Sequence, residues 1–242
     1  MIVCAKDETE IKTITEWHEK CHPVKKDIQW KDKRSAKELA RYWTEGPISD
    51  FINFLHSYGY KFDSYKGYPE FGTKFDSYNG DRKNDLVIVP DNNEFFCSIE
   101  GKADESFGEK TFLDQITIAV TATKKNSDSD QIPRIMELYG KYFLYNKECL
   151  NLYYQLTYWF AGTIAETKRR GISKAVMIVQ IFDSESLDSK KKQVNQQSLN
   201  KLVSIISNGE VTEIKENTLS MVICNEYTQG IELQIGKFVV QV

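Results

Sequence analysis

Three charged residues, Asp85, Glu100 and Lys102, stand at the outer ends of two apolar runs that a short polar segment separates. The segment, Asp-Asn-Asn at 91–93, is typical of a tight turn, because Asn and Asp tolerate the left-handed backbone that hairpin turns need. A two-residue turn centred on 92–93 predicts an antiparallel hairpin in which Asp85 lies opposite Glu100. Side chains in a strand alternate with a period of two, so Lys102 is expected on the same face as Glu100.

Two carboxylates and one amine at the end of an apolar hairpin are costly to bury unless a cation compensates them. Adjacent carboxylates with a backbone carbonyl nearby are ligands that suit Mg²⁺. The alternative is a salt-bridged sheet edge, since acidic and basic side chains on neighbouring strands can stabilise a hairpin. We favour a metal site, because the runs 86–89 and 95–99 indicate strands buried on both faces, which have little other reason to carry three charges at one level.

These residues resemble the signature of the PD-(D/E)XK nuclease superfamily, which stands here as Asn84-Asp85 and Glu100-Gly101-Lys102. Asn84 replaces the leading Pro of that signature. The segments 34–43, 99–108 and 153–166 are similar to an uncharacterised bacterial branch of the superfamily. The resemblance implies an α/β fold with a restriction-endonuclease-like core, a central mixed β-sheet flanked by α-helices. It also implies a hydrolase that acts on phosphodiester bonds.

Within this resemblance, Asp85, Glu100 and the Gly101 carbonyl are expected to hold Mg²⁺ or Mn²⁺, which activates a water molecule and neutralises charge at the scissile phosphate. Lys102 would position that water or stabilise the developing charge. The implied substrate is nucleic acid, with DNA as the default. RNA is an alternative substrate, and a non-catalytic interaction protein that retains the fold is an alternative function.

Five further residues are candidates for supporting the site. Glu105 follows the motif directly, Glu70 precedes the hairpin, and Glu38 lies on an upstream helix. Glu105 could instead begin the next helix, where acidic residues are favoured, and Glu38 could complete a capping box with a Ser35 N-cap. Gln155 and Tyr154 lie where related nucleases carry a Gln or Tyr near the site, although they could equally be a buried polar pair.

The net charge of −3 does not favour a general nucleic-acid-binding domain, which is usually basic. Local basic clusters are candidate phosphate contacts, although cations are also common at solvated helix ends. The candidate contacts are Lys124, Lys125, Lys168, Arg169, Arg170 and Lys190. A homodimer is a further possibility.

The whole chain, residues 1–242, is expected to form one nuclease-like domain, because no Pro, Gly or Ser-rich linker interrupts it. Its helical N-terminal segment, residues 1–60, is expected to pack on the core. No run approaches the ~20 apolar residues of a membrane span, and the N-terminus is not typical of a secretory signal. The five cysteines are scattered and odd in number, which indicates free thiols in a reducing cytoplasm. We therefore expect a cytoplasmic protein without a membrane partner.

The elements that must position the site follow from periodicity and from Gly and Pro breaks. Helices are expected at 8–20, from Ser35 to the break at Gly46, and at 48–58, 110–125, 150–170 and 189–206. Besides the hairpin, strands are expected at 175–182, 221–224 and 231–242. A repeated Lys-Phe-Asp-Ser-Tyr, at 61–65 and 74–78, predicts a pair of similar strands.

Overall fold

The computed structural model describes residues 2–23, 29–78, 80–184, 188–223 and 225–242 of the 242-residue chain. Within these ranges one mixed sheet of eight strands runs through the molecule in the order β2-β1-β3-β4-β5-β6-β8-β7. The strands are β1 (Ile2–Cys4), β2 (Glu10–Ile11), β3 (Tyr65–Thr73), β4 (Arg82–Pro90), β5 (Phe96–Lys102), β6 (Lys174–Asp183), β7 (Thr218–Val222) and β8 (Glu232–Gln241). The predicted α/β class with a central mixed sheet flanked by helices is confirmed.

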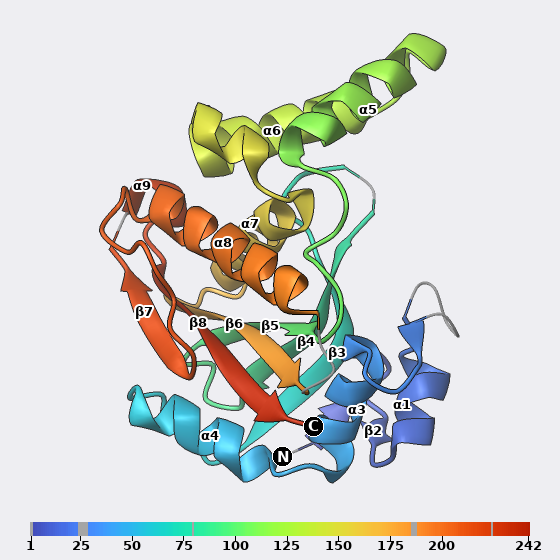
Figure 1. Cartoon of the computed structure of the whole chain (residues 1–242), viewed down its shortest axis with the longest axis vertical. Helices are drawn as coiled ribbons and strands as arrows, with labels where there is room; N and C mark the ends of the chain where they lie inside the picture. The colour runs from blue at the N-terminus through green and yellow to red at the C-terminus, as the bar shows by residue number, and fades with distance from the viewer. Residues whose placement is uncertain (1, 24–28, 79, 185–187, 224) are drawn as a thin grey trace.

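Helices lie on both faces of this sheet (Figure 1). They are α1 (Ile14–Lys20), α3 (Ser35–Glu45), α4 (Ile48–Ser57), α5 (Phe112–Lys125), α6 (Gln131–Phe143), α7 (Tyr154–Arg169), α8 (Ser189–Ile206) and α9 (Asn225–Thr228), with a 3₁₀ turn, η1, at Lys147–Asn151. The N-terminal segment contains helices, as expected, and it also contributes β1 and β2 to the sheet edge.

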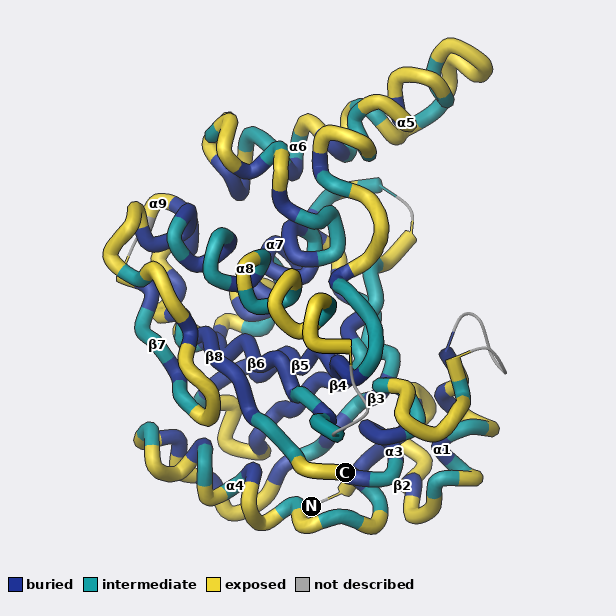
Figure 2. Tube along the Cα trace, in the orientation of Figure 1, coloured by how far each residue is buried: buried dark blue, intermediate teal, exposed yellow. Residues whose placement is uncertain are grey.

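Two apolar cores sandwich the central strands. On one face α3 and α4 bury Trp43 and Phe51 against side chains of β4, β5 and β6. On the other face α7 and α8 bury Trp159 and Leu202 against β6 and β8. The central strands are dark along most of their length in Figure 2, which shows that little of them reaches solvent. A charged side chain on β4 or β5 is therefore held in an environment of low polarity.

The β4–β5 hairpin has the predicted register. Leu86 pairs with Ile99, so the positions of Asp85 and Glu100 follow as the next opposed pair. The predicted two-residue turn is wrong, because Asn93 donates its N–H to the Pro90 carbonyl at 3.0 Å and residues 91–95 connect the two strands. The register survives the change of turn, because Leu86, Val87 and Ile88 still pair with Ile99, Ser98 and Cys97.

Several element boundaries differ from the expectation. The two repeat copies are not paired strands: residues 61–64 precede β3, and 74–78 form bends after it. The helix expected at 150–170 begins only at Tyr154, because the 152–154 backbone instead exchanges hydrogen bonds with Lys110 and Phe112.

Helix α6 was not predicted, since Pro133 and Gly140 interrupt its pattern. Pro133 lies in the first turn, where its missing N–H costs little. The described cysteines, Cys4, Cys21, Cys97 and Cys149, are free and buried, and Cys224 lies outside the described residues.

Candidate active site

Asp85, Glu100 and Lys102 converge where the β4–β5 ladder ends. The last backbone pair before the site is Leu86 with Ile99. Beyond it, the Asp85 carboxylate takes the place of a backbone acceptor, and its Oδ2 accepts the Gly101 N–H at 2.8 Å. The two strands thus open around a carboxylate that is held by the backbone of the opposing strand.

Glu100 is the most deeply buried of the three residues, with 1% of its surface exposed. Its Oε1 accepts hydrogen bonds from the Lys102 amine at 2.6 Å and from the Gln155 amide at 2.5 Å. Its Oε2 is also buried, and no donor of the described residues reaches it. The Asp85 carboxyl lies at hydrogen-bonding distance from Glu100, so two groups that only accept when ionised face each other.

The electrostatics follow from this crowding. Burial, with the charge of Asp85, raises the pKa of Glu100 to about 8, and Lys102 opposes the shift. Burial also raises the pKa of Asp85. For Lys102, burial favours the neutral amine, but the charges of Glu100 and Asp85 outweigh it and raise its pKa. Near neutral pH the pair of carboxyls therefore retains a proton beside a charged lysine unless a cation replaces that proton.

A local irregularity in β3 adds a third carboxyl. Tyr68 and Phe71 are three residues apart, yet both pack on the same apolar cluster, so the alternation of side chains breaks between them. The break is at Glu70, whose φ of 49° is left-handed. The β3–β4 register skips this residue and Asp85, which stand opposite each other. Burial and the charge of Asp85 raise the pKa of Glu70 to about 8.

Asn84, which occupies the place of the signature proline, ties this irregular stretch to α7. Its amide donates to the Phe71 carbonyl at 3.1 Å, and its Oδ1 accepts from the Ser98 hydroxyl at 2.7 Å. The same hydroxyl accepts the Trp159 indole N–H at 2.6 Å. A buried chain of hydrogen bonds thus holds the strand segment that carries Asp85.

The site opens into a cleft of about 640 Å³. Segments around the N-terminus of α3 and the loop before α5 form two of its walls. The charged residues that line it are Glu70, Asp85, Glu100, Glu105 and Glu109 with Arg34, Lys83, Lys102 and Lys110. Acidic and basic side chains are nearly balanced, so a divalent cation would make the cleft positive.

Three of the five supporting candidates line the cleft and two do not. Gln155, Glu70 and Glu105 line the cleft. Glu105 binds the start of α3, where its Oε1 accepts the Ser35 N–H at 3.1 Å. Glu38 points elsewhere: it accepts the Lys33 N–H at 2.8 Å and pairs with Arg41, and the residue at the N-cap of α3 is Arg34 rather than Ser35.

Tyr154 does not line the cleft, whereas its neighbour on the same helix face, Tyr158, does. The Arg82 guanidinium lies over both rings, 5.7 Å from each centroid. Tyr158 was missed by sequence reasoning, although its spacing of three residues from Gln155 places both on one helix face. Lys83 was also missed, although it lies two positions before Asp85 in the strand.

The six candidate phosphate contacts do not line this cleft. Gln155 is in the first turn of α7 and Lys168 is in the last, so about 20 Å of helix separates them. Arg169 and Arg170 pair with Glu166, and Lys168 donates to Gln229 at 3.2 Å.

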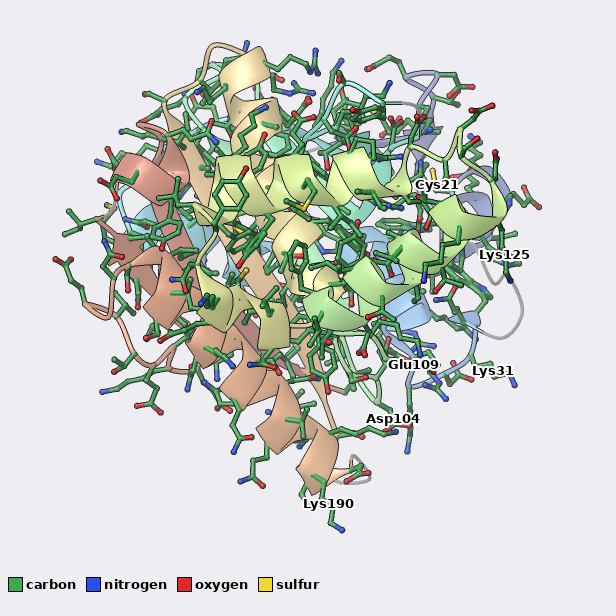
Figure 3. The ribbon with its side chains drawn as sticks, turned by 90° about the horizontal axis from the view of Figure 1, so that it is seen from above. Cys21, Lys31, Asp104, Glu109, Lys125 and Lys190 are labelled. Atoms are coloured by element: carbon green, nitrogen blue, oxygen red, sulfur yellow. The ribbon has the colours of Figure 1, made fainter. Side chains whose placement is uncertain are left out.

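Figure 3 shows the two remaining clusters far apart. Lys125 lies at the end of α5, Lys190 lies at the start of α8, and they stand on different sides of the molecule. In a nuclease some of these basic residues would be expected to rim the cleft that contains Asp85, and none of the six lines it.

The residues present fit a divalent cation in one respect. Two carboxyls meet with a buried oxygen, Glu100 Oε2, that has no donor, and a cation would satisfy it. Across the described ranges, however, no group of three or more His, Cys, Asp and Glu side chains is arranged to hold a metal ion. A cation here would take its remaining ligands from backbone carbonyls and water.

A family model matches nearly the whole chain. The model of a domain of unknown function, DUF6946, matches residues 10–241. The chain belongs to this family. No curated protein and no solved structure matches it. Among the helices of the described residues, none combines the length and apolar character needed to cross a membrane.

Proposed function

We propose that this DUF6946 protein is a phosphodiester hydrolase that depends on Mg²⁺ or Mn²⁺ and acts on nucleic acid, with DNA as the first substrate to test. The meeting of Asp85 and Glu100 at the opened ladder carries the proposal, because Glu100 Oε2 is buried there without a donor. Asp85, Glu100 and the Gly101 carbonyl would hold the cation. When bound, it would lower the pKa of a water molecule and neutralise charge on the scissile phosphate.

The protein's own groups orient this chemistry. Lys102 is held between Glu100 and the Phe107 ring, 5.1 Å from the ring centroid, so its amine stays at the cleft floor. There it would position the attacking water or stabilise developing charge. Gln155 donates to the same oxygen of the Glu100 carboxylate and helps to fix it. Glu70, with a pKa of about 8, would exchange a proton near neutral pH beside Asp85.

The arrangement of strands around the site supports the family resemblance. The hairpin β4–β5, with β3 on one side and the parallel strand β6 on the other, carries the Asp and Glu-x-Lys residues between α3 and α7. We interpret this unit as the restriction-endonuclease-like core. A cytoplasmic location and a homodimeric form complete the proposal.

A non-catalytic interaction protein is the second candidate. The observation that favours it is the charge of the cleft, where five acidic residues face four basic ones and the stronger basic clusters lie elsewhere. Such a cleft offers phosphate little net positive charge in the absence of a cation.

Two measurements made together test the proposal. We expect purified protein to nick plasmid DNA, or cleave RNA, with Mg²⁺ or Mn²⁺ and not with chelator. We also expect its melting temperature to rise with Mg²⁺, since the folded state binds the ion and the unfolded chain does not. Asp85→Ala should lose both effects, whereas Lys102→Ala should lose cleavage and keep the thermal shift. A wild-type protein with neither cleavage nor thermal shift would contradict the proposal and favour the interaction protein.

A further inference from the structure

Helices α5 and α6 form a hairpin that stands off the body of the molecule (Figure 1). Of the residues of α5, Phe112 and Ala119 are buried. Much of the helix surface is open, as the yellow segments of Figure 2 show. Leu113, Ile118 and Val120 are apolar and exposed by 49%, 40% and 39%.

The composition of α5 is unusual for a helix in solvent. Between Asp114 and Lys124, nine consecutive residues, Gln-Ile-Thr-Ile-Ala-Val-Thr-Ala-Thr, carry no charge. Six of them are β-branched, a class with reduced helix propensity. A surface helix normally has a charged outer face, and one made of such residues draws its stability from packing. The exposed side of α5 thus has a composition typical of a helix face that packs against other protein.

The polar groups on this side are turned inward. The Thr117 hydroxyl donates to the Leu113 carbonyl at 3.1 Å, and the Thr121 hydroxyl donates to the Thr117 carbonyl at 2.9 Å. Threonines that bond to their own helix in this way present methyl groups outward. Leu113, Thr117, Val120 and Lys124 recur at helical spacing and lie on the side away from Ala119. They form an apolar stripe that ends in a lysine.

We propose that the stripe binds a second copy of this chain, with the two α5 helices antiparallel about a twofold axis. The charges at the helix ends support this occupant. Asp114, whose carboxylate also caps its own helix through Thr111, stands at one end, and Lys124 with Lys125 stands at the other. Antiparallel pairing brings each Asp114 beside the partner's Lys124, whereas parallel pairing would bring like charges together. An interface of this kind is self-complementary, as a twofold dimer requires.

This inference is independent of the proposed chemistry, but the pairing would bring the two clefts near each other. Lys110, which lines the cleft, precedes α5 by two residues. A helix of 14 residues is about 21 Å long, so the two copies of Lys110 would lie roughly 20 Å apart or somewhat more.

Analytical ultracentrifugation of the full chain tests the pairing. A small apolar helix pair is expected to associate with a Kd of about 1–10 µM, so wild-type protein at about 100 µM should sediment at twice the chain mass of 28.0 kDa. Val120→Glu should raise the Kd at least about 100-fold, because it buries an unpaired charge at the interface. The change is at an exposed position and leaves the monomer fold unaltered.

Ile223→Glu is the matched control, because Ile223 is apolar, is 73% exposed and lies outside α5. It should dimerise like the wild type. Lys124→Glu with Lys125→Glu should weaken the dimer by about tenfold through loss of the end charges. A wild type that is monomeric at about 200 µM, or a Val120→Glu variant that still dimerises, overturns the proposal. A monomeric wild type that binds nucleic acid only when Val120 is intact would assign the stripe to nucleic acid instead.

Discussion

At the scale of single residues, the hydrogen bonds of the described residues satisfy the buried carboxyl oxygens of the site only partly. Lys102 and Gln155 hold one oxygen of Glu100, while the other oxygen is buried without a donor among the described residues. Replacing one carboxyl by an amide would supply a donor at almost the same volume. The residues that make the site suitable for a cation are therefore also the residues that destabilise it in a cation-free state.

This balance predicts the pH dependence of stability. In the unfolded chain Glu100 has its ordinary pKa of 4.5, and in the folded state its pKa is about 8. The folded state thus binds more protons, so the stability of the metal-free protein should fall as pH rises from about 5 to about 8.

Asp85→Asn should flatten this fall and stabilise the apo protein by about 1–2 kcal/mol at pH 8. Urea denaturation in chelator, at several pH values between 5 and 8.5, measures it. The pairing of Asp85 with Glu100 would be refuted if the variant showed the same slope as the wild type.

At the scale of elements, the site depends on strands that depart from regular geometry. Glu70 adopts a left-handed backbone in the middle of β3, at the point where the β3–β4 ladder skips a pair. A non-glycine residue in this conformation costs of order 1 kcal/mol and persists only where the surroundings or the function require it. The irregularity directs a carboxyl into the cleft next to Asp85.

Substitution at Glu70 separates backbone strain from charge. Glu70→Gly removes both and should stabilise the protein by about 1–2 kcal/mol, while Glu70→Gln removes only the charge and should give a smaller gain. If the proposed metal-dependent hydrolysis occurs, both variants should reduce it. Equal stability of the glycine and glutamine variants in urea would show that the left-handed conformation stores no strain.

The hydrogen-bond chain from Trp159 through Ser98 to Asn84 connects three elements across the sheet. Ser98→Ala should destabilise the protein by about 2–3 kcal/mol, because it leaves the Trp159 N–H and an Asn84 oxygen buried without partners. Ser198→Ala, at an exposed position of α8, is the matched control and should be nearly neutral. Thermal unfolding compares the two, and similar melting temperatures would mean that water replaces the lost hydroxyl.

At the scale of the whole molecule, the helices decide which charges reach the cleft. Arg34, Lys83 and Lys110 line it, whereas the clusters at the ends of α5, α7 and α8 do not. Electrostatic binding of a phosphate chain should therefore depend on the former set. A cation beside the cleft's acidic residues would strengthen that binding.

Nucleic-acid binding should distinguish Lys110 from Lys190. With Ca²⁺ in place of Mg²⁺ to limit cleavage, Lys110→Ala should weaken binding of a labelled oligonucleotide. It should also reduce the slope of log K against log salt concentration by about 1, because one fewer counterion is released. Lys190→Ala, on α8, should leave both unchanged. Fluorescence anisotropy at several salt concentrations measures the slope, and an effect of Lys190 equal to that of Lys110 would place the bound chain outside the cleft.

The opposed positions of Asp85 and Glu100 and the α/β class of the fold could both be predicted from the amino-acid pattern. The meeting of Asp85 with Glu100 depends on a local hairpin, whose register follows from the alternation of side chains, and this register is present although the turn differs. Helices such as α8 and the buried strand β6 were evident from periodicity.

The residues that surround Asp85 and Glu100 could be identified only from the tertiary structure. Gln155 reaches Glu100 across 55 positions, and Ser35 meets Glu105 across 70, through packing of helices on the sheet that no local pattern encodes. The left-handed Glu70 and the absence of the basic clusters from the cleft have the same origin. Local contacts are set by the chain's own geometry, whereas the cleft walls are set by the free energy of burying distant apolar faces together.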